Sequence, residues 1–277
     1  MIMIKRVLST FLAALMICLW GCSEKTDPEI KSSLESAIES VNGESRLECD
    51  YMLEITFGER SVLYYAKGDT QWDRAENRFS MVYDRTLLGE SSKMESYFAD
   101  GKMQSVINGK LVAVNEVKTD VLSTFPNFKI PACYGEADIS VSDNSSGKAY
   151  KFIADDTKKL CEAVIGDIYA LATVIKKPQP EKTEYGEAQC VYTVKDGRVV
   201  SVRYEFDVTL FDTPASTANY TPPESEYTLD LHVVAKLEYT DFGDEVEISG
   251  YTPEESADES SADSENESEE SADGEKD

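Results

Sequence analysis

The chain has 277 residues and carries 53 acidic against 27 basic side chains, a formal net charge of −26 at pH 7. Nucleic-acid phosphates would repel so negative a protein, which argues against nucleic acid as a partner. The same charge argues against a protein that lies flat on anionic lipid through a basic face.

The first 22 residues resemble a bacterial lipoprotein signal. A basic start precedes an apolar stretch of thirteen residues, 7–19, which is too short for a membrane span of about 20 residues but has the layout of a secretory signal. The run Leu19-Trp20-Gly21-Cys22 ends this segment, with Trp20 where the pattern usually has a small residue. In the signals that it resembles, the cysteine is lipidated and becomes the first mature residue.

This resemblance implies a membrane tether on Cys22. A diacylglyceryl group on its sulfur supplies the two acyl chains that stable anchoring needs. We therefore expect an extracytoplasmic protein, lipid-anchored to the outer face of a cell membrane, with the plasma membrane and an outer membrane both remaining open. The expected division is a signal peptide over 1–21, the lipidated cysteine and a spacer over 22–26, one folded domain over 27–252 and an acidic disordered tail over 253–277. The alternative is an ordinary secretory signal with an incidental cysteine.

The folded domain is predicted to begin with a helix. Asp27 can cap it, Pro28 suits its first turn, and Gly43 can end it. Its apolar residues recur at helical spacing: Ile30, Leu34, Ile38 and Val41.

The segments that follow are predicted to be antiparallel strands. Apolar and polar residues alternate over 47–57, which places one face of that strand on a core and the other in water. Shorter strands are predicted around 62–66 and 79–83. Asp-Gly at 100–101 and Asn-Gly at 108–109 are two-residue hairpin signals that join three more strands. The next predictions, in order, are a short amphipathic helix over 115–125, strands near 139–141 and 149–153, and a long helix over 156–177.

Long strands close the domain. Asp-Gly at 196–197 predicts a hairpin that pairs Val191 with Val202. Every second residue is apolar over 200–210 and over 227–239. Strands of that length extend about 35–43 Å at ~3.3 Å per residue, well beyond the usual five or six residues. The last strand of the domain is predicted to continue through 246–248.

The acidic tail differs in composition from everything before it. From Glu254 to Asp277 only Glu, Asp, Ser, Ala, Asn, Gly and one Lys occur. Such a segment cannot bury enough apolar area to offset its ordering entropy, so we expect it to be disordered. A solvating, self-repelling brush is the favoured interpretation, and a weak cation-binding or partner-binding tail is the alternative.

No catalytic, cofactor or metal site is predicted. The only histidine, His232, alternates with polar Asp230 on the expected solvent face of its strand, so it offers no catalytic triad. Neither a glycine-rich phosphate loop nor a Cys-x-x-Cys pair occurs, and we expect no cofactor and no zinc. The sequence favours none of the three pairings that four cysteines of the domain allow: Cys49, Cys133, Cys161 and Cys190. The chain is therefore expected not to be an enzyme.

The apolar face of the predicted sheet must be covered, and the chain offers too few other strands for a matching second sheet. Two amphipathic helices and a possible third can cover it. The predicted fold is therefore α+β, a highly curved antiparallel β half-barrel wrapped around two or three α-helices.

Four segments carry a resemblance in the order of elements and the placement of turns. They are PEIKSSLESAIESVNGES, YFADGKMQSVINGK, YTVKDGRVVSVRYEF and LEYTDFGDEVEIS. Over about 27–249 the chain looks like the LolA/LppX-like superfamily of lipoprotein and lipid carriers, in its variant from Gram-positive bacterial lipoproteins. In that family a half-barrel and its helices enclose a hydrophobic cavity for acyl chains.

The resemblance implies that this chain binds or shuttles a hydrophobic ligand, a lipid or an acyl chain. It also implies a cavity lining made of inward positions on three strands: Leu53, Ile55, Phe57, Val202, Tyr204, Phe206, Leu231 and Val233. The alternative for each of them is direct packing against the helices with no cavity.

A second function also stays open at this point. The fold could serve as the scaffold of a non-catalytic interaction module in the cell envelope. Exposed aromatic side chains would then contact a protein partner or a glycan, and the candidates are Tyr97, Tyr185 and Tyr220. Fold analogy alone does not choose between the two functions, because one fold hosts many functions.

Overall fold

The computed structural model describes residues 27–58, 61–117, 129–165, 182–211 and 228–250. Within them the chain forms two α-helices, twelve strands and one 3-10 turn. In chain order they are α2 (Pro28–Asn42), β1 (Arg46–Phe57), β2 (Ser61–Asp73), β3 (Arg78–Leu87), β4 (Glu90–Ala99), β5 (Lys102–Ile107), β6 (Lys110–Glu116), β7 (Ser140–Asn144), β8 (Gly147–Ile153), α4 (Thr157–Ile165), β9 (Lys182–Tyr185), β10 (Gln189–Lys195), β11 (Arg198–Phe211), β12 (Thr228–Phe242) and η3 (Gly243–Glu245).

Helix α2 begins and ends where its sequence predicts. The Asp27 carboxylate accepts a hydrogen bond from the backbone N–H of Glu29 at 2.9 Å, which satisfies one of the free donors of the first turn. Gly43 ends the helix and its N–H donates to the carbonyl of Glu39. The buried residues of the helix are Leu34, Ala37, Ile38 and Val41.

The strands form one open antiparallel sheet in the order β6-β5-β4-β3-β2-β1-β12-β11-β10-β8-β7, with β9 paired to the far end of β11. Three of its hairpins turn at the predicted dipeptides. In each, both residues have positive φ, for example 51° at Asp196 and 77° at Gly197. This is the geometry of a type I′ turn, which matches the twist of the paired strands.

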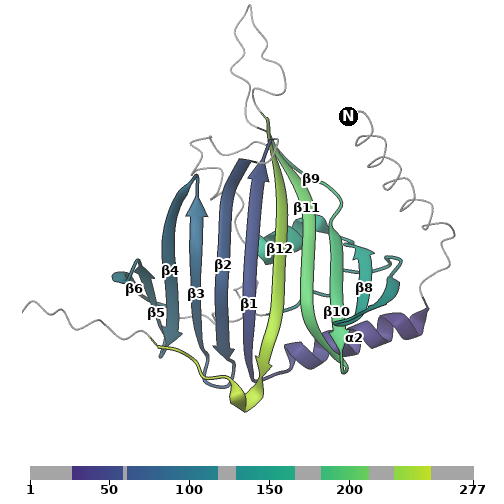
Figure 1. Ribbon diagram of the computed structural model, residues 1–277, viewed down its shortest axis with the longest axis horizontal. Helices are drawn as coiled ribbons and strands as arrows, with labels where there is room; N and C mark the ends of the chain where they lie inside the picture. Colours follow the sequence, from purple (N-terminus) through teal and green to yellow (C-terminus); the bar gives the residue numbers. More distant parts are fainter. Residues whose placement is uncertain (1–26, 59–60, 118–128, 166–181, 212–227, 251–277) are drawn as a thin grey trace, which may run out of the picture.

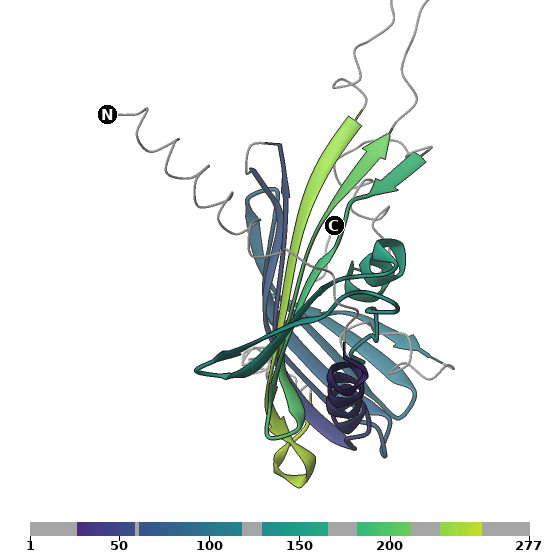
Figure 2. The same cartoon turned by 90° about the vertical axis from the view of Figure 1, so that its right-hand side faces the viewer.

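The sheet is curved, and both helices lie on one side of it (Figures 1 and 2). We call this side the helix-bearing face and the other the outer face. Figure 1 shows α2 and α4 over the half of the sheet that contains β12, β11 and β10. The arrangement is the predicted α+β half-barrel in outline. Neither described helix is long and apolar enough to cross a membrane.

Several predicted boundaries need correction. The strands predicted around 62–66 and 79–83 are in fact 13 and 10 residues long, because their polar stretches also pair in the sheet. Residues 115 and 116 of the helix predicted over 115–125 belong to strand β6 instead, and residue 117 is irregular. The rest of that prediction, 118–125, lies outside the described residues. Helix α4 covers only the first part of the predicted helix, whose residues beyond 165 are likewise not described.

The end of the domain and the β10–β11 register also differ from the prediction. Strand β12 stops at Phe242, and the 3-10 turn η3 follows it, so 246–248 is not a strand. Val191 pairs with Arg203, not with Val202. A bulge between Thr193 and Val194 adds one residue to the ladder and shifts the register by one position.

Candidate functional site

Three cross-strand rows of apolar side chains occupy the helix-bearing face. The rows run across β1, β12 and β11, and they join Leu53 to Ala235 to Tyr204, Ile55 to Val233 to Phe206, and Phe57 to Leu231 to Val208. Residues that pair across neighbouring strands point to the same face of a sheet. All eight predicted lining residues therefore share this face, since Val202 lies one row further along, opposite Leu237.

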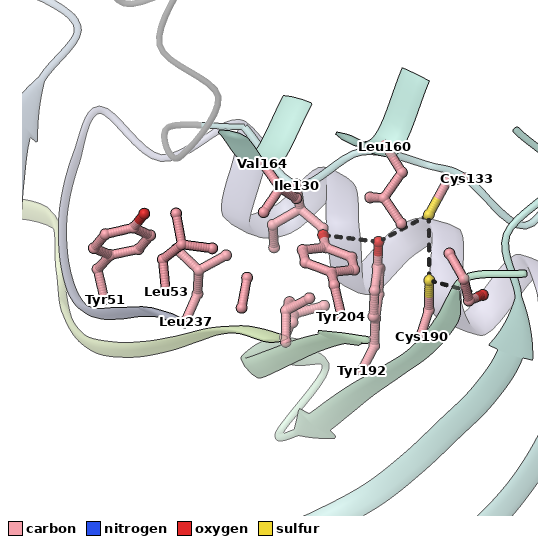
Figure 3. Packing of buried hydrophobic residues seen from close by; sticks show 14 of the residues in the cluster. Tyr51, Leu53, Ile130, Cys133, Leu160, Val164, Cys190, Tyr192, Tyr204 and Leu237 are labelled. Carbon is pink, nitrogen blue, oxygen red and sulfur yellow. Dashed lines mark hydrogen bonds between the residues drawn. The ribbon is translucent and has the colours of Figure 1, made fainter. Parts of the chain in front are cut away.

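These residues belong to one continuous cluster of buried side chains. Seven of the eight are at most 4% exposed, and Phe57 packs against the cluster as a partly buried residue. Helix α2 packs on β11. Figure 3 shows Ile130, Leu160 and Val164 facing the sheet residues Tyr204 and Leu237 across the interior. The rows over β1, β12 and β11 thus contribute directly to the core.

A buried polar cluster lies within this core. The Tyr192 hydroxyl donates to the carbonyl of Pro131 at 2.7 Å and lies 3.1 Å from the Tyr204 hydroxyl. It is also 3.4 Å from the sulfur of Cys133, which is 3.9 Å from the sulfur of Cys190 (Figure 3). Burial raises the pKa of both tyrosines well above the ordinary value. Sequence reasoning did not find this cluster, because residues 129–135 carry no strand or helix pattern that would place Cys133.

The helix-bearing face continues across β2, β3 and β4 with a different character. Ala66 pairs with both Leu53 and Arg85, and Gly68 pairs with both Tyr51 and Tyr83. Arg85 and Tyr83 therefore point to the same face as the apolar rows, as does Tyr64, which pairs with Ile55. All three are only partly buried. A mixed surface of aromatic rings and one guanidinium thus adjoins the apolar core.

The small residues of β2 make this arrangement possible. A Cβ atom on Gly68 would lie 2.0 Å from the carbonyl oxygen of Val82 and 2.7 Å from the Cβ of Tyr83, so only glycine allows β3 to approach so closely. Ala66 is fully buried beside it. Because neither residue projects a large side chain, Tyr64, Tyr83 and Arg85 are the large side chains around them on the helix-bearing face.

The outer face carries the polar residues of the long strands, as predicted. His232 lies there with its side chain 43% exposed, and its Nδ1 is 2.7 Å from a carboxylate oxygen of Asp207. Glu205 lies on its other side at 3.7 Å. Within the described ranges, no group of three histidine, cysteine or acidic side chains is arranged to hold a metal ion.

The aromatic residues of the interaction-module hypothesis are less accessible than expected. Tyr97 is partly buried, and its hydroxyl donates to Glu95 at 2.7 Å. Tyr185 packs against the core as a partly buried residue. Tyr220 lies outside the described residues. The prediction that these side chains are exposed is therefore wrong for Tyr97 and Tyr185.

No protein-family model and no curated protein matches this chain. Among solved structures, LprF from Mycobacterium bovis is similar with a TM-score of 0.46 and 8% sequence identity, over 82% of this chain and 98% of LprF. A DUF1329 family protein from Desulfovibrio piger is similar with a TM-score of 0.30 and 13% identity, over 81% of this chain and 96% of that one. With TM-scores below 0.5, neither assigns a family or a ligand to this chain.

Proposed function

We propose that the protein is a membrane-anchored extracytoplasmic lipoprotein that binds a hydrophobic ligand, a lipid or an acyl chain, on the helix-bearing face of its sheet. The observation that carries this proposal is the continuity of that face. Buried apolar rows on β1, β12 and β11 pass directly into partly exposed residues at the end of β2, β3 and β4 that carries Tyr64, Tyr83 and Arg85. At the other end of these strands the same face is buried, with Trp72, Phe79 and Phe98 in the core. A ligand chain lying against the partly exposed residues would bury its own apolar surface beside the buried rows.

The placement of the two described helices supports this reading. Both lie over the β12–β10 half of the sheet (Figure 1). Met94 on β4 pairs with both Tyr83 and Ile107 and is partly exposed on the helix-bearing face. Strand β4 lies in the other half of the sheet from α2 and α4 (Figure 1). Apolar side chains that remain accessible beside a core are characteristic of surfaces that bind a ligand.

The anchor part of the proposal rests on Cys22. Only four residues separate it from Asp27, the cap of α2. At most ~3.6 Å per residue, a spacer of that length would hold the folded domain within about 20 Å of the membrane surface. The domain would then be placed where lipids enter and leave a bilayer. The proposed role is binding or transfer, with no catalytic step.

Ligand binding is tested with a pair of matched lysine substitutions. Met94→Lys places a charge on the helix-bearing face, and Val82→Lys places one on the outer face of the neighbouring strand β3. We expect a neutral apolar dye to bind the unsubstituted chain and the Val82→Lys variant equally, and to bind Met94→Lys at least about tenfold more weakly. Equal loss in both variants, or no dye binding to the unsubstituted chain, would contradict the proposal.

The anchor is tested separately. Cells that express the unsubstituted chain are expected to incorporate labelled fatty acid into it, and the protein should partition into the detergent phase. A Cys22→Ala chain should lose both properties while its ligand binding stays intact. Fatty-acid incorporation that persists in Cys22→Ala would refute the lipidation of this cysteine.

A further inference from the structure

Arg85 is placed on the ligand side of the sheet by the strand register. It pairs with Ala66 on β2 and with Ser92 on β4, and Ala66 in turn pairs with Leu53 of the apolar rows. The side chain is partly exposed. A positive charge therefore stands at the border between the buried core and the accessible part of the helix-bearing face.

The charge of Arg85 differs in its surroundings from that of other arginines in the protein. Four described arginines each form an ion pair with a carboxylate: Arg46 with Asp73, Arg78 with Glu76, Arg198 with Glu44, and Arg203 with Glu205. Arg85 forms none with any carboxylate of the described ranges. In a chain of net charge −26 with 53 acidic residues, carboxylates are abundant. A shortage of carboxylates therefore does not explain why Arg85 has no such partner among the described residues.

A hydrogen bond also orients the guanidinium of Arg85. Its Nε donates to the hydroxyl of Ser92 at 3.2 Å. A guanidinium carries five N–H donors in a rigid plane, and a bond through Nε leaves the two terminal nitrogens free to bind a second group side by side. Two parallel N–H donors match the two oxygens of a carboxylate or a phosphate.

Two phenol groups lie beside this charge. The side chains of Tyr64 and Tyr83 interact with each other. Both are close enough to Arg85 for its positive charge to act on their pKa values, in the lowering direction. Burial raises the pKa of both phenols above the ordinary value, so both stay protonated at neutral pH. Protonated hydroxyl groups can donate to an anion that approaches the guanidinium.

We propose that Arg85, Tyr64 and Tyr83 form a binding site for the anionic head of an acyl ligand, a carboxylate or a phosphate, while the chain of the ligand lies on the partly exposed part of the helix-bearing face beside the apolar rows. This inference rests on the proposed function and narrows it to amphiphiles with one negative head group. Ser92 acts in it as a positioning residue, because it fixes the plane of the guanidinium without contacting the ligand.

Two pairs of probes test the site, each pair sharing one acyl chain. Oleate is compared with methyl oleate, and a monoacylglycerol phosphate with the corresponding monoacylglycerol. Affinities are measured on the complete chain carrying Cys22→Ser and on the variants Arg85→Gln, Arg85→Lys and Arg203→Gln. Arg203 is the matched control, because it is an arginine on the outer face that is already paired with Glu205. Thermal unfolding checks that each variant is folded.

We expect at least one anionic probe to bind about tenfold more tightly than its neutral partner. Arg85→Gln should abolish this preference and leave the affinity for the neutral probe unchanged, Arg85→Lys should retain part of it, and Arg203→Gln should retain all of it. The pair that shows the preference identifies the head group as a carboxylate or a phosphate.

Equal binding of the anionic and neutral probes overturns the anion site and leaves the apolar-ligand function standing. A preference that survives Arg85→Gln also overturns it. If none of the four probes binds, the proposed function fails, and this inference fails with it.

Discussion

The sulfur atoms of Cys133 and Cys190 lie 3.9 Å apart in the interior, although 57 residues separate them in the chain. The hydrogen bond with the Cys190 thiol lowers the pKa of Cys133 and outweighs the opposing effect of burial. The hydrogen bond with Cys133, together with burial, raises the pKa of Cys190. Cys133 is therefore the sulfur that ionises first, and an ionised sulfur is the nucleophile in thiol–disulfide exchange.

We predict that a small disulfide such as oxidised glutathione will join Cys133 to Cys190. The Cys133 thiolate displaces one glutathione thiolate from the small disulfide, and Cys190 then displaces the second, so two protein thiols are oxidised as one small disulfide is reduced. Peptide mapping without reductant should find the two cysteines in one cross-linked species. The bond should stabilise the fold by about 2–4 kcal/mol. Cys133→Ser should abolish both effects and Cys161→Ala neither; recovery of the two cysteines on separate peptides would disprove the prediction.

The close contact of β2 with β3 makes Gly68 sensitive to any side chain. Gly68→Ala should lower the free energy of unfolding by at least ~2 kcal/mol, because the added methyl group would lie 2.0 Å from a backbone oxygen. Gly186→Ala is the control, since its added atom would meet only ordinary contacts at 3.4 Å or more. It should change stability by less than about 1 kcal/mol. Urea unfolding of both variants measures the difference, and equal midpoints would show that the strands can separate freely.

The Asp73 carboxyl makes the stability of the folded state depend on pH. Burial raises the pKa of its carboxyl, but the backbone N–H of Glu76 and the guanidinium of Arg46 outweigh burial and hold this pKa below the ordinary value. Such a carboxyl stabilises the folded state above its unfolded pKa of about 4, and the contribution is lost as the pH falls through the lower, folded pKa.

Asp73→Asn should therefore lower stability at pH 7 by about 1–2 kcal/mol and reduce the loss of stability below pH ~4. Urea unfolding at a series of pH values from neutral to acid measures both effects. Asp84→Asn, at an exposed position on β3, should show the same dependence of stability on pH as the unsubstituted protein. A profile of Asp73→Asn that parallels the unsubstituted protein would rule out the role given to this ion pair.

Tyr192 is predicted to hold the segment around Pro131 in place. Tyr192→Phe removes the donor to a buried carbonyl, and an unsatisfied buried acceptor costs about 1–3 kcal/mol. Tyr150→Phe removes a hydroxyl that contacts the exposed residue Ser33, where water can substitute, so it should cost less. Thermal unfolding compares the two variants. A larger loss for Tyr150→Phe would contradict the importance of the Pro131 contact.

Local chemistry was enough to predict some parts of this fold. Asp27 and Gly43 bound α2 because capping depends only on neighbouring backbone groups. The dipeptide at 196–197 predicts its hairpin because Asp and Gly tolerate positive φ. Strict alternation over the long strands correctly assigns Leu53 and Phe206 to the same buried face, since the side-chain period of a strand is two.

Other parts depend on contacts that the sequence does not reveal. Lys67-Gly68-Asp69 looks like the end of a strand, yet β2 continues through it because β1 and β3 pair with it on both sides. The bulge after Thr193 shifts a register that no turn residue indicates. The surroundings of Arg85 emerge only when the registers of four neighbouring strands are combined. The Cys133–Cys190 contact depends on a segment without periodicity.

Strand β6 pairs only with β5, and β7 only with β8, so within the described chain the sheet has two free margins. In a closed barrel, strand number and stagger fix the internal diameter. Here a small change in strand twist can bring the margins closer or move them apart while every ladder hydrogen bond is retained. The fold thus fixes no internal diameter, and under the proposed function the same sheet would accept ligands of different width.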